Sequence, residues 1–381
     1  MRTQGYDDIW PQVVEIVGDV RARGDAALLE WTERLDGVRL DSPRVAPDQL
    51  AEARLDDEAL VALRRLAAAV EAFHAAQRPP DVRVSPYPGI EAERRFVPLD
   101  SVGVYAPGGL AAYPSSLVMA AVPARVAGVR RIAVATPRPS PGMLRAAREV
   151  GVDEVYAVGG AQAIAALAFG TESVAPVDKI VGPGNRWVTA AKLLVSSRVG
   201  IDLPAGPTEL VIVADAAADP ELAAVDLRAQ LEHGPDGAAL LITTSAALAD
   251  KVGELCPEAE TQVVGSLDEA IAATNAFAPE HLQLHVADPE ALAARVTSAG
   301  AVFLGEQTSS VLGDYAVGTN HVLPTGGLAR AAGGLGLEAF LKPIQLVRAT
   351  PEGVAAAAEI VGPLARVEGL PLHAAAVGAR L

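Results

Sequence analysis

The chain has 381 residues, half of them hydrophobic, and carries a formal net charge of −16 at pH 7. This length exceeds what one ordinary core fills, so we expect two domains. Such an acidic balance argues against a nucleic-acid partner, which needs a basic surface, and the single cysteine, Cys256, allows neither an intrachain disulfide nor a Cys-based metal site.

The N-terminal stretch MRTQGYDDIWPQ contains acidic residues and no apolar core, so it is not typical of a secretory signal peptide. The sequence has no run of about 18 apolar residues without breakers, so no membrane span is expected. We therefore predict a cytoplasmic protein.

The predicted elements begin with helices over residues 11–35 and 43–77. From residue 101, short β-branched runs alternate with Ala-rich helical segments. In a first series, strands are expected at 101–106, 131–135, 154–158 and 179–181, with helices at 114–128, 141–150, 161–169 and 185–197. In a second series, strands are expected at 209–214, 238–243, 281–286 and 301–304, with helices at 219–232 and 288–298. This alternation is the signature of βαβ units and a parallel sheet.

The fold class is therefore predicted to be α/β: two domains with parallel, incompletely Rossmann-like sheets plus helical N-terminal and C-terminal extensions. A Pro- and Gly-rich stretch over 202–208 marks the crossing between the domains. We expect residues 105–212 to form a nucleotide-binding domain and residues 1–104 with 213–335 to form the other domain. Residues 336–381 form a tail with a strand at 344–349 and a terminal helix. Whether the two series are distant duplicates is left open.

Three glycine-rich turns follow predicted strands of the first series, where a GxGxxG fingerprint is absent. They read Tyr105-Ala106-Pro107-Gly108-Gly109, Gly159-Gly160-Ala161-Gln162 and Gly182-Pro183-Gly184-Asn185. Ligands bind outside the carboxyl ends of strands in open α/β sheets, and a helix N-terminus there favours a phosphate. A glycine at one such position is commonly only a turn residue, but three in series favour a nucleotide site.

Most of the six histidines lie in polar motifs late in the chain. Gln230 and His233 share one face of the last turn of a predicted helix, where they could ligate a metal. The alternative is a histidine that only interacts with the helix dipole. Glu280 and His281 stand together at the entrance of a predicted strand, and both are types that transfer protons near neutral pH. The alternative is a solvated Glu–His pair.

Two further polar segments follow. Asp314 and His321 lie in a turn-rich loop without apolar periodicity, the kind of segment that commonly carries function on α/β sheets. Asp314 could be a hard oxygen ligand. Glu368 and His373 lie close to the C-terminus, where a histidine is ordinarily just exposed.

Taken together and in this order, these motifs resemble the histidinol dehydrogenase family. The resemblance runs from residues 21–28 to the C-terminus and so covers nearly the whole chain. Its specific stretches are 102–109, 158–165, 181–185, 204–215, 230–236, 279–282, 313–325 and 368–373.

The resemblance implies an NAD-dependent, four-electron oxidation of L-histidinol via L-histidinal to L-histidine, a step of histidine biosynthesis. It also implies one zinc ion per subunit, and a homodimer with shared active sites in which the C-terminal tail reaches the partner subunit. The implied catalytic pair is Glu280 and His281. The implied zinc ligands are Gln230, His233, Asp314 and His373. Residues implied to bind substrate are Thr208, Gln230, His233, Asp314, His321, Glu368 and His373. Residues implied to bind NAD are Tyr105, Gln162 and Asn185.

The sequence departs from the usual family pattern in several places. The stretch between His233 and Glu280 is short, Thr208 stands where serine is usual, and the segment 308–312 reads Thr-Ser-Ser-Val-Leu instead of containing Pro-Glu-Ala. Lys342-Pro343 stands where Lys-Arg is common. The nitrogen and oxygen ligands also suit manganese or cobalt.

Three functions therefore remain open. One is histidinol oxidation, and another is a paralogue that uses the same zinc and Glu–His machinery on a different small polar alcohol. The third is a non-catalytic zinc- or nucleotide-binding protein on the same fold. The division of roles between Glu280 and His281 is also left open.

Overall fold

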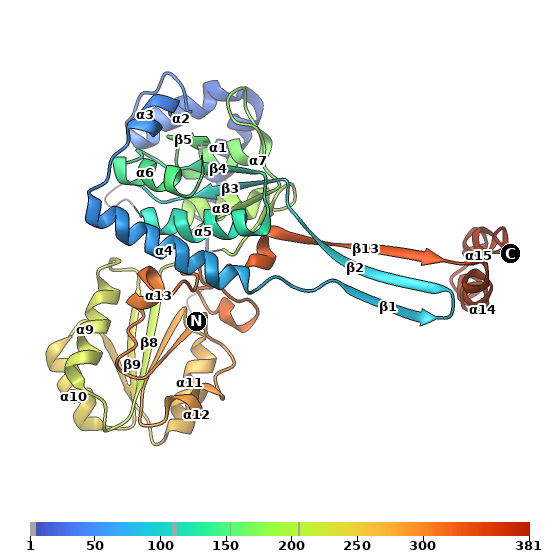
Figure 1. Cartoon of the computed structure of the whole chain (residues 1–381). Helices are drawn as coiled ribbons and strands as arrows, with labels where there is room; N and C mark the ends of the chain where they lie inside the picture. The colour runs from blue at the N-terminus through green and yellow to red at the C-terminus, as the bar shows by residue number, and fades with distance from the viewer. Residues whose placement is uncertain (1–4, 109–112, 153, 205) are drawn as a thin grey trace. The chain divides into compact units, whose positions relative to one another are not determined.

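The computed structural model describes residues 5–108, 113–152, 154–204 and 206–381, and it divides into two compact units (Figure 1). The main unit consists of Met1–Gln77 and Leu99–Phe340. The arm unit consists of Arg78–Pro98 and Leu341–Leu381. Within the described residues, every helix is either too short or too polar to cross a membrane.

The first sheet of the main unit has five parallel strands in the order β5-β4-β3-β6-β7. These strands are β3 (Ser101–Tyr105), β4 (Arg131–Ala135), β5 (Glu154–Tyr156), β6 (Lys179–Val181) and β7 (Gly200–Ile201). The helices between them are α5 (Pro114–Ala127), α6 (Pro141–Glu149), α7 (Gly160–Phe169) and α8 (Arg186–Val195). β3 is almost wholly buried, as expected for a central strand of a parallel sheet covered on both faces.

The second sheet repeats this order as β10-β9-β8-β11-β12, again all parallel. Its strands are β8 (Glu209–Ala214), β9 (Ala238–Thr243), β10 (Glu260–Val263), β11 (His281–His285) and β12 (Ala301–Leu304). Its helices are α9 (Pro220–Leu231), α10 (Ala246–Leu255), α11 (Leu267–Phe277) and α12 (Pro289–Ala293), followed by the short α13 (Val311–Tyr315) and two 3-10 turns at Leu328–Arg330 and Leu337–Phe340. The α/β prediction is confirmed, and the two series share one topology.

The central strand β8 explains why helices cover both faces of the second sheet. Leu210 and Ile212 enter one hydrophobic core with α9 and α10, whereas Val211 and Val213 enter another with α11. Alternate side chains of a strand point to opposite faces, and Figure 1 shows α9 and α10 on one side of this sheet and α11 and α12 on the other. A continuous apolar run was therefore the correct signal for a buried parallel strand.

The N-terminal helices differ from the sequence prediction in both number and place. The segment 11–35 is two helices, α1 (Trp10–Arg23) and α2 (Asp25–Asp36), which break at Gly24, where φ is +59°. The segment 43–77 is α3 (Pro47–Glu52) and α4 (Asp57–Ala75). The buried face of α1 shares one core with the almost wholly apolar α7 and with α8, and α4 packs against α5. The first 77 residues therefore cover the first sheet, whereas residues 1–104 were predicted to form the other domain with 213–335.

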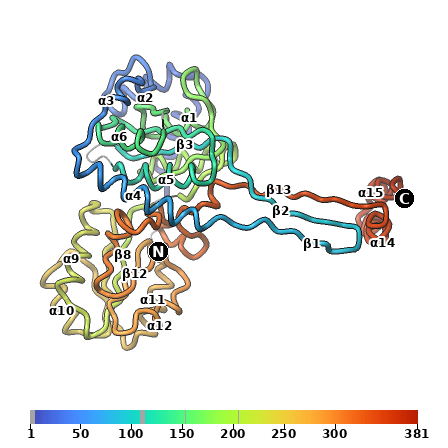
Figure 2. The backbone as a smooth tube through the Cα atoms, in the orientation of Figure 1, coloured from blue at the N-terminus to red at the C-terminus, as the bar shows by residue number. Residues whose placement is uncertain are grey.

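The arm unit combines two segments that are far apart in the chain. β1 (Val82–Tyr87), β2 (Ile90–Pro98) and β13 (Leu341–Ala349) form an antiparallel sheet in the order β1-β2-β13, and Figure 2 lets the reader follow the three adjacent strands. The chain then ends in α14 (Pro351–Val367) and α15 (Pro371–Gly378). β1 and β2 were not predicted from the sequence, and neither strand contains a buried residue. The tail was predicted to begin at residue 336, but the fully buried Leu337 and Phe340 belong to the main unit.

Candidate functional site

The predicted acid–base pair lies at the amino end of β11. Glu280 directly precedes this strand and His281 is its first residue. The parallel register places His281 opposite Leu210 of β8, so Glu280 is adjacent to Glu209 at the start of that strand. The site therefore forms at the amino edge of the second sheet, opposite to the carboxyl edge where open α/β sheets ordinarily bind ligands.

The Glu280 carboxylate is almost fully buried, with 7% of the residue exposed. Its Oε2 accepts a hydrogen bond from the Glu209 N–H at 3.0 Å, and the Thr208 hydroxyl also donates to it. Burial raises the pKa of Glu280 to about 7, and the negative charge of Asp314 adds to this shift against the two hydrogen bonds. A carboxyl group that titrates near neutrality can accept and release protons at physiological pH.

His281 is a buried imidazole whose surroundings fix its tautomer. Its Nδ1 lies 3.2 Å from the backbone carbonyl of Glu209. Because a carbonyl only accepts hydrogen bonds, the proton sits on Nδ1 and the lone pair on Nε2. Burial lowers the pKa of His281, so the ring is a neutral base at pH 7. Its Nδ1 also lies 3.6 Å from the Glu280 Oε2.

Asp314 and His321 meet beside this pair. The Nδ1 of His321 lies 3.6 Å from the Asp314 carboxylate, and its Nε2 lies 3.2 Å from the Ser116 hydroxyl in the first turn of α5. Both Asp314 and His321 are close enough to Glu280 to influence its pKa. His321 thus connects the amino edge of the second sheet to a helix that begins at the carboxyl edge of the first.

Gln230 and Thr208 extend the cluster toward the end of α9. Gln230 is buried and its Nε2 donates to the Thr208 hydroxyl at 3.2 Å. This bond uses the amide nitrogen and leaves the amide oxygen as the atom able to ligate a metal. His233 lies exposed just beyond the C-terminus of α9. Burial raises the pKa of Tyr315, and the charges of Asp314 and Glu232 add to that shift, so the end of α9 lies near α13.

A zinc ion fits these residues by donor type. An amide oxygen from Gln230, an imidazole from His233 and a carboxylate from Asp314 are acceptable zinc ligands. Over the part of the chain that the structure describes, no group of three or more His, Cys, Asp or Glu side chains is close enough to hold a metal.

Glu368 and His373 belong to the arm unit and not to this cluster. Glu368 caps the C-terminus of α14 and His373 lies in the first turn of α15. Both side chains are exposed. Their roles as a substrate contact and a zinc ligand stay predictions.

The residues predicted to bind NAD gather at the carboxyl edge of the first sheet. Tyr105 ends β3, and its hydroxyl accepts a hydrogen bond from the Gly160 N–H at 3.2 Å. Asn185 caps α8 by accepting hydrogen bonds from two backbone N–H groups, each at 3.1 Å. Gln162 is fully buried, and its Oε1 has no hydrogen-bond partner among the described residues. Gly109, part of the first predicted turn, lies outside the described residues.

Sequence reasoning missed the residues that support this edge. The Nε2 of Gln162 donates to the Asp36 carboxylate at 3.3 Å, and burial raises the pKa of Asp36. Lys192 and Asp202 form a buried ion pair around the Gly182 turn. Asp202 accepts the Gly182 N–H at 2.7 Å and Lys192 donates to the Gly182 carbonyl at 3.1 Å. Asp36 carried no signal, because its helix lies far from the glycine turns in sequence.

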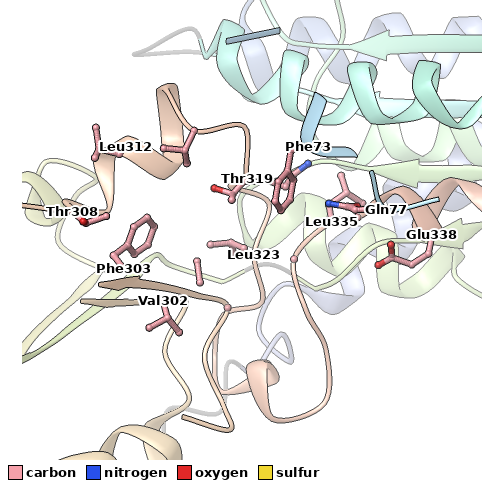
Figure 3. Close-up of a pocket in the computed structure, with 16 residues that line it drawn as sticks. Phe73, Gln77, Val302, Phe303, Thr308, Leu312, Thr319, Leu323, Leu335 and Glu338 are labelled. Atoms are coloured by element: carbon pink, nitrogen blue, oxygen red, sulfur yellow. The ribbon is translucent and has the colours of Figure 1, made fainter. Parts of the chain in front are cut away.

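A cavity of about 490 Å³ adjoins the acid–base pair within the main unit (Figure 3). Its lining comes from α4, β12, α13 and the segment that carries Asn320 and Leu335. Phe303 lines it, and the ring centre of Phe303 lies 6.1 Å from that of His281. The cavity is mostly apolar, and neither Glu280 nor His281 is among the residues that line it.

Comparisons with known proteins agree along the entire chain. The family model described as histidinol dehydrogenase matches residues 1–381. The histidinol dehydrogenase of Ruegeria pomeroyi is 46% identical, with 98% of this chain and 92% of the relative covered. That of Methanopyrus kandleri is 47% identical, with 98% and 94% covered.

Solved structures give the same result. The crystal structure of histidinol dehydrogenase from Elizabethkingia anophelis superimposes with a TM-score of 0.94 at 35% identity, covering 99% of this chain and 93% of that one. A succinate-semialdehyde dehydrogenase from Burkholderia pseudomallei, at 14% identity and a TM-score of 0.52 over 90% of this chain and 88% of its own, is similar in fold alone.

Proposed function

The chain belongs to the histidinol dehydrogenase family of oxidoreductases, and from this premise we propose that it oxidises L-histidinol through L-histidinal to L-histidine with two molecules of NAD. The observation that carries the proposal is the buried pair of Glu280 and His281, in which the Glu280 Oε2 lies 3.6 Å from the Nδ1 of the neutral His281 ring. Two successive oxidations at one carbon need two proton acceptors, and the pair provides them.

In the first oxidation, His281 takes the hydroxyl proton of the alcohol. Its Nε2 holds the lone pair because Nδ1 is engaged by the Glu209 carbonyl. Bound NAD supplies the hydride acceptor for both oxidations. The neutral imidazole becomes an imidazolium, and the Asp314 charge favours this form.

In the second oxidation, Glu280 activates water. The aldehyde stays bound, the Glu280 carboxylate removes a proton from water, and the resulting oxygen adds to the carbonyl carbon. The resulting hydrate anion gives up a hydride, for which bound NAD would be the acceptor, to leave the acid, and Glu280 releases the water proton to solvent. The Glu280 pKa of about 7 supports this assignment, because a carboxylate of that basicity removes protons more readily than an ordinary glutamate.

Zinc, held by Gln230, His233 and Asp314 with His373 as fourth ligand, would orient the amine and imidazole nitrogens of the substrate. The donor types of these residues support the assignment. Thr208, His321 and Glu368 would contact substrate, and Tyr105, Gln162 and Asn185 would contact NAD. We also propose a cytoplasmic location, which nothing in the sequence opposes.

We further propose a homodimer in which the arm unit completes the partner's site. The arm unit exposes large apolar side chains on α14 and α15: Leu364 is 56% exposed, Val367 85% and Leu372 80%. Such a set is ordinarily covered by another protein surface. Mixing inactive Glu280→Ala chains with inactive His373→Ala chains should restore some activity, since one site of the heterodimer then has every group. No recovery after verified subunit exchange contradicts the shared site.

The yield of NADH tests the main proposal. L-Histidinol should give two NADH per molecule with little free aldehyde, and chelation should abolish the activity. His233→Asn should lose the metal, which elemental analysis measures, and retain its fold. If another alcohol were oxidised at least about tenfold more efficiently than L-histidinol, the paralogue function would replace this one.

A further inference from the structure

Glu209 is a second buried glutamate of the site that has no assigned role. It is the first residue of β8, the central strand of the second sheet. The register pairs Leu210 with His281, so Glu209 and Glu280 occupy the matching positions just before it. The two acids therefore face one another at the amino edge.

The two glutamates bind each other's main chains. The Glu209 N–H donates to the Glu280 Oε2 at 3.0 Å, and the Glu280 N–H donates to the Glu209 Oε2 at 3.3 Å. The Glu209 carbonyl also faces the His281 Nδ1 at 3.2 Å. One residue thus contacts both catalytic side chains, and a rotation of either carboxylate would leave an N–H group without its acceptor.

The other carboxylate oxygen of Glu209 holds a different segment. Its Oε1 accepts the Gly326 N–H at 3.0 Å. Gly326 lies in a turn, next to the buried Thr325, whose hydroxyl accepts the Gly206 N–H. This turn follows His321 in the chain, so the Glu209 side chain joins the segment of a substrate-contacting residue to the backbone of Glu280.

We propose that the Glu209 side chain is a positioning residue that holds Glu280 and the Thr325–Gly326 turn in the arrangement needed for oxidation, without touching substrate. The inference rests on the proposed function of the Glu280–His281 pair. The two N–H donors also explain how a carboxylate is tolerated at this buried position. Burial and the neighbouring Glu280 raise the pKa of Glu209 to about 7, while the two N–H donors oppose that rise.

Two variants separate geometry from charge. Glu209→Gln keeps the size but replaces one acceptor oxygen with an NH₂ group that faces an N–H donor. Glu209→Asp keeps the charge but is one methylene shorter, so it cannot span both donors. Leaving a buried donor unsatisfied should lower kcat about ten- to a hundredfold in both variants. KM for NAD should not change, because the nucleotide residues lie on the first sheet.

The pH profile of kcat/KM distinguishes a positioning role, in which the charge of Glu209 acts on Glu280, from a purely structural role. The titratable groups that face Glu280 are Glu209 of β8, the adjacent His281, Asp314 of α13 and His321 of the following loop. Because the negative charges of Glu209 and Glu280 disfavour each other, removing the charge of Glu209 should lower the pKa of Glu280. The acid limb of kcat/KM should therefore move to lower pH in Glu209→Gln and stay in place in Glu209→Asp.

The matched control is Glu260→Gln, since Glu260 is also the first residue of a strand of this sheet but is exposed on the edge strand β10. It should behave as the unchanged protein. Amide hydrogen exchange at Gly326 and Glu280 should be faster in Glu209→Gln, a readout that needs no turnover. Wild-type protein that produces no NADH would overturn the proposed function alone. Full activity with unchanged exchange in both Glu209 variants would overturn the positioning role.

Discussion

The two parallel sheets have the same strand order but gather their candidate functional residues at opposite edges. On the first sheet, Tyr105, Gln162 and Asn185 lie at the carboxyl edge, where α7 and α8 begin. On the second sheet, Glu280 and His281 lie at the amino edge, where α9 ends. One topology therefore serves two kinds of site.

Helix dipoles give this difference a physical meaning. Helix N-termini carry a partial positive charge and favour phosphates, which suits a dinucleotide at the carboxyl edge of the first sheet. Helix C-termini carry a partial negative charge and favour cations, which suits a metal ion and an amine at the amino edge of the second. The shared fold therefore provides an environment for anions at one edge and for cations at the other, and the candidate residues at each edge match that environment.

The largest effect is expected from a substitution that removes a catalytic group at the amino edge of the second sheet and leaves the carboxyl edge of the first sheet unchanged. Glu280→Gln removes a general base, so kcat should fall about 100- to 10,000-fold. KM for NAD should stay unchanged, because that edge is untouched. Steady-state NADH production measures both constants. A parallel rise in KM for NAD would mean that the two edges are not separable.

The pH dependence of kcat/KM is also expected to come from the amino edge of the second sheet. Glu280 must be ionised to act as a base, and its pKa is raised to about 7. Below pH 7, kcat/KM should therefore fall about tenfold for each pH unit and level off above it. His281, whose pKa burial lowers, is neutral at pH 7 and adds no second limb there. A profile that is flat from pH 5 to 8 would contradict the assignment.

Gln162→Leu tests the carboxyl edge alone. Loss of a hydrogen-bonding amide should raise KM for NAD about tenfold, with kcat at saturating NAD unchanged. The melting temperature should change little, because leucine removes the buried Oε1 that has no partner but also removes the hydrogen bond from Nε2 to Asp36. Calorimetry measures the melting temperature, and steady-state kinetics of the same preparation measure KM for NAD. A drop in stability with normal KM would make Gln162 a structural residue.

Asn185 sharpens the comparison further, because it has a structural role that the structure already explains. Asn185→Ala removes the N-cap of α8 and should lower the free energy of unfolding by about 1 kcal/mol. Asn185→Ser retains a capping oxygen and should restore that stability. If the side-chain amide contacts NAD, KM for NAD rises in both variants. Normal KM in the serine variant would leave only the capping role.

The smallest effect is expected at Thr208. Its hydroxyl donates to Glu280 and accepts from Gln230, and serine keeps both bonds. Thr208→Ser should therefore change kcat/KM for L-histidinol by less than about fivefold, within the energy of one methyl group. Thr208→Val removes the hydroxyl and should lose considerably more. Equal losses in the two variants would show that the methyl group matters as much as the hydroxyl.

Local sequence pattern determined most of the elements of both sheets. The strands at 131–135, 179–181, 209–214, 238–243 and 301–304 were predicted with the bounds that the structure has. These strands are mainly apolar and bounded by turns, and all but the edge strand β12 are largely buried, so their apolar runs were visible in the sequence. The order of motifs was also enough to predict the family, which the comparisons confirm.

Tertiary structure alone decided the other features. Strands β1 and β2 contain no buried residue, and the pairing of β2 with β13 joins residues more than 240 positions apart. The packing of α1 on α7 and α8 depends on a matching apolar surface that no local pattern specifies. Glu209 and Asp36 were invisible for the same reason. Their roles come from partners 71 and 126 positions away, and hydrogen bonds of that range exist only once the sheets have formed.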